Sequence, residues 1–225
     1  MSLCPARGCL HVLGSFVCHV DGCEVRLPEH PRRLVVRLAV GEHRMARRLA
    51  AACLWPDTDH AARRLRYVLW QLRRLTGEQI IQAGHDAVML ADGVHVDLDE
   101  AERLVHRPLS TDTDWSLLAC PLLPESDDDE VRAARQRWDR LRLLALERLA
   151  HTKLAEGDIS GAIDVAGHAL GIDPLNEGPH RLLAEANLAR HDMATARRVY
   201  DDYRADLDHN LGVEPSMEFR RLLRR

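Results

Sequence analysis

The sequence has no apolar run approaching the ~18 residues that a membrane-spanning helix requires. Its first residues, 1–14, also lack the basic stretch and following apolar stretch of a secretory signal. We therefore expect no membrane contact and a cytoplasmic location. With 225 residues, 46% of them hydrophobic and 29% charged, the chain has room for two domains that bury real cores.

Motifs of the common catalytic sites are absent as well. The sequence contains neither G-x-x-x-x-G-K-[ST] nor G-x-G-x-x-G, and neither G-x-S-x-G nor H-E-x-x-H. Its 13 histidines are scattered, and none is paired with a cysteine or carboxylate at the spacing of metal ligands. We expect no enzyme activity, no catalytic residue and no cofactor.

The cysteines lack the C-x2-C spacing that is typical of zinc sites. Four of the six lie near the start in two C-x4-C pairs, namely Cys4, Cys9, Cys18 and Cys23. The second pair flanks Asp21-Gly22, a strong hairpin turn. Strand alternation would place one apolar set on a core face: Phe16, Cys18, Val20, Cys23, Val25 and Leu27. Core packing is the favoured interpretation, and a metal or thiol sensor is the alternative.

Charge is divided unevenly along the chain. Residues 1–95 carry 13 Arg or Lys and 9 Asp or Glu, whereas the remainder carries 18 and 26. A basic front half and an acidic rear half indicate a polyanionic partner for the front half only.

The front half predicts strands, then helices, then a second hairpin. A first hairpin is expected over residues 10–27, followed by a break at Pro28 and Pro31. Apolar spacing predicts helices over 32–40, 44–54 and 60–75, the last with Asp59 as its N-cap. Residues 79–83 and 87–91 form the second hairpin around Gly84-His85-Asp86, and Asp92-Gly93 turns the chain into 94–96.

The third helix, over residues 60–75, has two contrasting faces. One face gathers apolar residues: Ala61, Ala62, Leu65, Val68, Leu69 and Leu72. The other mixes arginines with aromatic residues: Arg63, Arg66, Tyr67, Trp70, Gln71 and Arg74. Solvated faces rarely place two large aromatics among arginines. An Arg-rich helix followed by a hairpin is typical of a winged-helix DNA-binding domain.

The rear half predicts a helical repeat. Residues 127–155 form one long amphipathic pattern, whose acidic start suits the positive end of a helix dipole. Matches then recur at an offset of 34 residues, the tetratricopeptide period: Leu149 with Leu183, Ala150 with Ala184, Leu154 with Leu188, Ala155 with Ala189, Asp158 with Asp192, Ala162 with Ala196 and Val165 with Val199. The fold class expected is mainly α, with a winged helix-turn-helix domain over 1–97 and an all-α, tetratricopeptide-like repeat domain over 98–225.

The chain resembles the Streptomyces antibiotic regulatory protein (SARP) family over residues 10–223. The rear stretches that carry the resemblance are Ala155-Glu156-Gly157-Asp158, Ala162-Ile163, Ile172-Asp173-Pro174-Leu175, His180-Arg181-Leu182-Leu183 and Leu211-Gly212-Val213-Glu214-Pro215-Ser216. In front, Leu54-Trp55, Leu65 and Leu72-Arg73-Arg74 match the family's signatures. The family joins an OmpR-type winged helix to a bacterial transcriptional activator domain.

The resemblance implies an activator that binds promoter DNA, often at direct repeats, and recruits RNA polymerase. A homodimer or a head-to-tail pair on DNA would suit such sites. The residues expected at DNA are Arg63, Arg64, Arg66, Tyr67, Trp70, Gln71, Arg73, Arg74 and, at the wing tip, His85. The loop expected to touch polymerase is Trp55, Pro56, Asp57, Thr58 and Asp59.

The sequence departs from the family pattern at the wing, at Trp70 and around residues 111–123, a region that is short and irregular. The wing lacks the usual aromatic in Asp86-Ala87-Val88-Met89-Leu90, and Trp70 stands where a small polar residue is usual. A helical-repeat interaction module that has lost DNA binding is therefore an alternative function.

Overall fold

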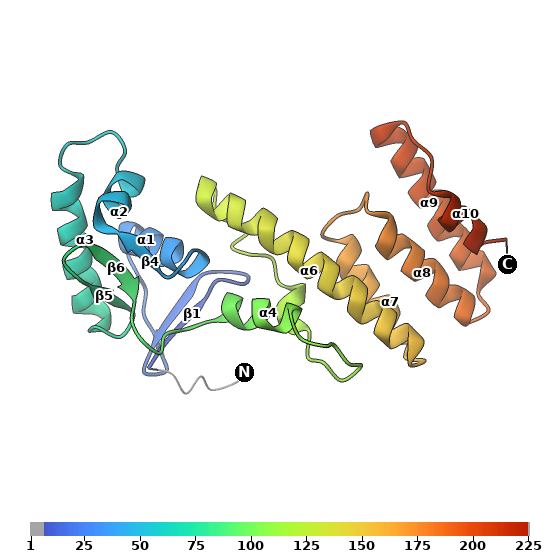
Figure 1. Ribbon diagram of the computed structural model, residues 1–225, viewed down its shortest axis with the longest axis horizontal. Helices are drawn as coiled ribbons and strands as arrows, with labels where there is room; N and C mark the ends of the chain where they lie inside the picture. Colours follow the sequence, from blue (N-terminus) through green and yellow to red (C-terminus); the bar gives the residue numbers. More distant parts are fainter. Residues whose placement is uncertain (1–6, 225) are drawn as a thin grey trace. The chain divides into compact units, whose positions relative to one another are not determined.

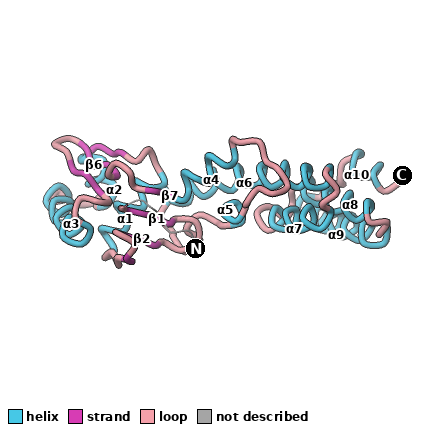
Figure 2. Tube along the Cα trace, turned by 90° about the horizontal axis from the view of Figure 1, so that it is seen from below, coloured by secondary structure: helices cyan, strands magenta, loops and turns pink. Residues whose placement is uncertain are grey.

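A computed structural model describes residues 7–224, and these form two compact units (Figure 1). The first unit runs up to Arg103 and takes in Cys120–Trp138. The second contains Leu104–Ala119 and continues from Asp139. Every described strand, magenta in Figure 2, belongs to the first unit. The predicted fold class, a small N-terminal α+β region followed by an all-helical domain, is confirmed.

The first compact unit includes residues 120–138, which lie apart in the sequence from its other residues. Residues 120–138 belong to the first unit because their backbone pairs with its N-terminal strand region. The Gly14 N–H donates to the Pro121 carbonyl at 2.7 Å, and Leu13 forms a β-bridge with Leu122. The buried Trp138 indole donates to the Cys120 carbonyl at 3.0 Å. No local sequence pattern predicts a contact between segments this far apart in the chain.

The first sheet has the order β3-β2-β1-β7. Its strands are β1 (Gly8–His11), β2 (Val17–Val20), β3 (Cys23–Glu24) and β7 (His95–Val96). The turn at Asp21 and Gly22, with φ of +49° and +80°, is where the hairpin was predicted. The predicted apolar face is only partly correct, because Cys18 is buried whereas Cys23 is exposed on a two-residue edge strand. Cys4 lies outside the described residues.

Three helices pack beside a second sheet. They are α1 (Glu29–Val40), α2 (Arg47–Leu54) and α3 (Ala61–Thr76), and their shared core contains Leu34, Leu38, Leu65 and Leu72. The predicted break at Pro31 is wrong, since this proline lies in the first turn of α1. There a missing N–H costs no helical hydrogen bond.

The second sheet corrects the predicted helix over 44–54. It has the order β4-β6-β5, with β4 at Arg44–Ala46, β5 at Ile81–Ala83 and β6 at Ala87–Leu90. Residues 44–46 pair with 87–89, Met45 opposite Val88, so the helix begins only at Arg47. Tertiary pairing has overridden an apolar spacing that fits a helix. The β5–β6 hairpin around residues 84–86 is as predicted.

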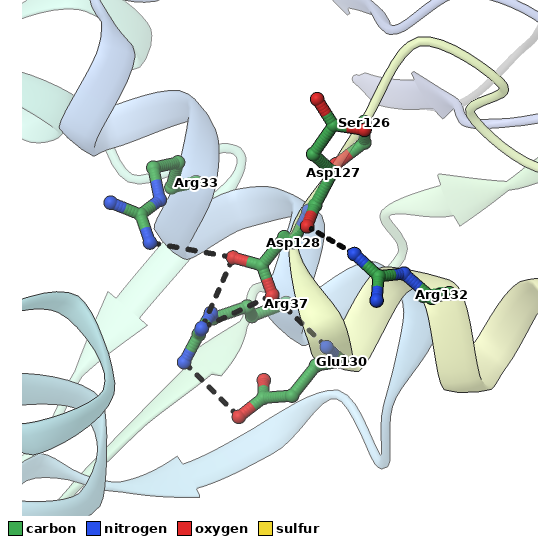
Figure 3. Close-up of polar contacts among 7 residues, drawn as sticks. All are labelled: Arg33, Arg37, Ser126, Asp127, Asp128, Glu130 and Arg132. Carbon is green, nitrogen blue, oxygen red and sulfur yellow. Dashed lines mark hydrogen bonds and ion pairs between the residues drawn. The ribbon is translucent and has the colours of Figure 1, made fainter.

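A buried arginine ties α1 to the start of α6 (Asp129–Ala155) within the first unit (Figure 3). Arg37 is 8% exposed and lies 3.1 Å from carboxylate oxygens of both Asp128 and Glu130. Arg33 reaches Asp128 at 3.4 Å. Burial raises the pKa of Asp128, but the hydrogen bond and charge of Arg37 outweigh it and hold the pKa below its ordinary value. The carboxylates of Asp128 and Glu130 therefore hold the start of α6 against α1, in addition to suiting the positive end of the helix dipole.

The other helices are α4 (Asp97–Val105), α5 (Ser116–Ala119), α7 (Ile159–Leu170), α8 (Glu177–Ala189), α9 (Met193–Leu211) and α10 (Met217–Leu222). The 34-residue repeat is visible in the packing: Ala150, Ala162, Ala184 and Ala196 are all at most 2% exposed. Side chains this small let α8 approach α7 and α9 closely. No helix among residues 7–224 is long and apolar enough to cross a membrane.

The repeat also extends to the turns between its helices. Asp158 and Asp192, 34 residues apart, cap α7 and α9 by accepting the N–H of Gly161 and Thr195, each at 2.9 Å. Their own N–H groups donate to the carbonyls of Lys153 and Asn187, which are likewise 34 apart. Each of these bonds closes the C-terminal turn of the preceding helix and satisfies a carbonyl that the helix leaves free.

Candidate nucleic-acid interface

Helix α3 is held in place by one buried face. Leu65, Val68 and Leu72 are at most 2% exposed and pack towards α1 and α2. At the C-terminal end the Thr76 hydroxyl donates to the Leu72 carbonyl at 2.8 Å, and Gly77 ends the helix at a φ of +63°. Ala62, predicted on the apolar face, is exposed. Fixing one face of the helix fixes which residues its other face presents.

The opposite face and the flanks of α3 present the predicted residues together. Exposed side chains project from residues 63, 64, 66, 67, 70, 73 and 74, and Gln71 is half-buried. Helix α3 contains five arginines and no carboxylate. Of these, Arg73 forms an ion pair with Glu78 at 3.0 Å, so its guanidinium group already has a partner. Among residues 7–224, no hydrogen bond or ion pair engages the guanidinium groups of Arg63, Arg64 and Arg66.

The aromatic residues of this face contact one another. The rings of Tyr67 and Trp70 stack with centroids 5.7 Å apart and planes 23° apart. The guanidinium carbon of Arg74 lies 5.5 Å from the centre of the Trp70 ring. Gln71 reaches the Tyr67 hydroxyl at 3.5 Å. The face thus offers cations, one amide and an aromatic surface to a partner.

The β5–β6 hairpin is anchored by Arg47, which sequence reasoning missed. Its backbone N–H donates to the Asp86 carbonyl at 2.9 Å, and its guanidinium donates to the Gly84 carbonyl at 2.8 Å. His85 stands at the tip, 2.7 Å from Asp86 and almost fully exposed. No local signal marks Arg47, because its role depends on the pairing of β4 with β6. These bonds hold the turn of the hairpin against the start of α2, and strand β5 of the hairpin contacts α3.

The loop over residues 55–59 divides into an anchor and an exposed part. Trp55 is 8% exposed and lies edge-on to His30, with ring centroids 5.2 Å apart. Pro56, Asp57 and Asp59 are exposed. The predicted N-cap at Asp59 is wrong: the N-cap residue of α3 is His60, whose side chain makes no capping bond. Thr58 accepts the N–H groups of His60 and Ala61, through its hydroxyl and its carbonyl.

Cys18 lies in a poor environment for a sensor thiol. Burial raises the pKa of Cys18 to about 11, which disfavours the thiolate that reacts or binds metal. Within residues 7–224, no group of three or more His, Cys, Asp or Glu side chains is arranged to hold a metal ion.

Comparison with known proteins assigns the rear part of the chain to a family. The model of the bacterial transcriptional activator domain matches residues 96–225. The fold is similar to that of EmbR from Mycobacterium tuberculosis, whose structure was solved in complex with a low-affinity phosphopeptide: the TM-score is 0.76 at 19% identity. The match covers 97% of this chain and 64% of the EmbR chain, so this chain spans less than two thirds of that protein. A search of curated proteins found no significant match. Because the family model accounts for more than half of the residues, the chain belongs to the bacterial transcriptional activator domain family, which comprises transcriptional regulators rather than enzymes.

Proposed function

We propose that the protein is a sequence-specific DNA-binding activator of the SARP type, with an OmpR-type winged helix. The observation that carries this proposal is the exposed face of α3, with five arginines and no carboxylate in the helix. A B-DNA major groove about 12 Å wide admits one α-helix. Arginine and glutamine side chains on that helix can donate to guanine and adenine edges, and neighbouring arginines can bind phosphates.

The second sheet provides the wing. With its turn held by Arg47, the β5–β6 hairpin presents His85 to the minor groove or the backbone. Arg64 and Arg73 lie on the flanks of α3 and would bind phosphates, Arg73 after leaving Glu78. The loop over residues 56–59 would contact RNA polymerase, with the buried Trp55 holding its base. In this proposal residues 1–97 bind DNA and residues 98–225 form the activator domain. The protein would act in the cytoplasm, as a homodimer or as a head-to-tail pair.

The test is selection of bound sites from random double-stranded DNA with the full chain. We expect one enriched sequence motif, and loss of that motif in the triple variant Arg63→Ala, Arg66→Ala, Arg74→Ala. The matched control is Arg197→Ala on α9, an exposed arginine outside the winged helix, which should select the same motif. If the wild-type chain enriches no motif, the DNA-binding function is wrong. The interaction-module function would then be favoured.

A further inference from the structure

Three exposed side chains of α3 form one stack: Tyr67, Trp70 and Arg74. They follow one another at intervals of three and four residues, which puts them on one side of the helix. Tyr67 and Trp70 are 59% and 52% exposed, yet their rings lie nearly parallel at 5.7 Å. Arg74 extends the stack, its guanidinium carbon 5.5 Å from the indole centre.

The stack distinguishes Arg74 from the other arginines of this face. A free arginine side chain loses up to ~2 kcal/mol of rotamer entropy when it is fixed. Contact with an aromatic face is attractive for a guanidinium group and limits its orientations before any partner arrives. Neither Arg63 nor Arg66 has such a contact, and Arg73 is paired with Glu78. Arg74 is therefore the most ordered cation on this face that has no carboxylate partner.

A restricted guanidinium orientation favours hydrogen bonding to a base edge, whereas phosphate binding depends on it little. A guanine presents N7 and O6 as two acceptors in one plane, and an arginine must bring its fork into that plane to bind both. A phosphate accepts from many directions.

We propose that Arg74 reads a guanine in the major groove and that Trp70, supported by Tyr67, is the positioning residue that orients it. The inference rests on the DNA-binding function proposed above. Aromatic and arginine side chains also mark protein interfaces. DNA is favoured here because no carboxylate in α3 offsets the five arginines.

The experiment uses the full chain and its selected site, with 7-deazaguanine replacing each guanine in turn. This analogue lacks only the N7 acceptor. At one position we expect the replacement to lower wild-type affinity by about five-fold or more, and to have no effect on Arg74→Ala. Trp70→Ala should lose most of the sensitivity at that same position, and Trp70→Phe, which keeps an aromatic face, should retain it. Because Trp70 is half exposed, its variants should melt at the wild-type temperature, and Arg63→Ala should keep the full sensitivity at this position.

Three results would overturn the assignment and leave DNA binding intact. In the first, Arg74→Ala and Trp70→Ala select the wild-type site and keep every 7-deazaguanine effect, which would assign the stack to a protein partner. In the second, Trp70→Ala alters preference at a different base pair from Arg74→Ala, which would show that the indole contacts DNA itself. In the third, Trp70→Ala loses affinity equally for all sequences. A wild-type chain that selects no site would instead contradict the proposed function.

Discussion

Gly157 and His191 lie 34 residues apart and both have left-handed backbone conformations, with φ of +86° and +61°. Each occupies the turn between two helices of one repeat, and each N–H donates to a carbonyl three residues earlier, that of Leu154 or Leu188. Glycine adopts this conformation without strain, whereas a residue with a Cβ is strained in it.

His191→Gly should therefore stabilise the protein by about 1 kcal/mol. His191 is exposed, and among the described residues its side chain has no polar partner, so the substitution removes little else. Gly157→Ala is the matched control and should destabilise by a similar amount, since it introduces the same strain at the equivalent position. Urea denaturation followed by helical circular dichroism measures both. Equal midpoints for wild type and His191→Gly would argue against the strain.

Acid should weaken the first unit through Asp128. Its pKa in the folded protein lies below the ordinary value, so the carboxylate contributes stability above the unfolded pKa of about 4. That stability is lost as the pH falls through the folded pKa. Asp128→Asn should cost about 2 kcal/mol at pH 7, and it should flatten the dependence of the unfolding free energy on pH between about 5 and 2.

The control for this prediction lies in the same cluster. Glu130 also pairs with Arg37, but its side chain is 46% exposed, and exposed pairs contribute at most ~1 kcal/mol. Glu130→Gln should consequently cost less than Asp128→Asn and should leave the steep acid dependence in place. Equal effects of the two variants would show that burial of Asp128 is not what matters.

The close approach of α8 and α9 should tolerate no charge at Ala196. This side chain is fully buried in a cluster with Ala184, Tyr203 and Phe219. Ala196→Arg would bury an unpaired cation, at a cost of several kcal/mol or more. We expect loss of the cooperative thermal transition of the second unit. Ala194→Arg, on the exposed side of α9, should change stability by about 0.5 kcal/mol or less.

DNA affinity should depend steeply on salt. Each phosphate that an arginine neutralises releases counterions, and the slope of log affinity against log salt is about 0.9 per contact. We expect the slope to become shallower by about one unit when a phosphate-binding arginine, such as Arg64, is changed to alanine. Fluorescence anisotropy with the selected site between 50 and 200 mM salt, a range of roughly four-fold, measures it. An affinity that does not change over this range would contradict binding through α3.

The anchor of the wing should matter for DNA binding. Arg47→Ala removes the bond to the Gly84 carbonyl and should weaken DNA binding by about five-fold, the equivalent of ~1 kcal/mol. Amide exchange at residues 84–87 should also become faster. The adjacent Arg48 is exposed and, within the described residues, makes no side-chain bond, so Arg48→Ala controls for the loss of charge. If both variants lose affinity equally and exchange is unchanged, the anchor has no such role.

What could be predicted from the sequence was the part that depends on local periodicity. The buried face of α3 and the 34-residue repeat are both present in the spacing of apolar side chains. The strand at residues 44–46 could not be predicted, because Met45 pairs with Val88, far along the chain. For the same reason Arg47 was missed, as was the packing of residues 120–138. The Tyr67–Trp70–Arg74 spacing was visible in the sequence, but the stacking of the rings needed side-chain positions.

Both bonds from Arg47 end on main-chain oxygens, those of Gly84 and Asp86. Every amino acid carries such an oxygen, so the anchor places no demand on the side chain at the hairpin tip. Position 85 can therefore vary, in evolution or by design, while the hairpin keeps its place beside α3. The fold separates the residue that positions the hairpin from the residue that meets the partner, which leaves the latter free to acquire new preferences without loss of the scaffold.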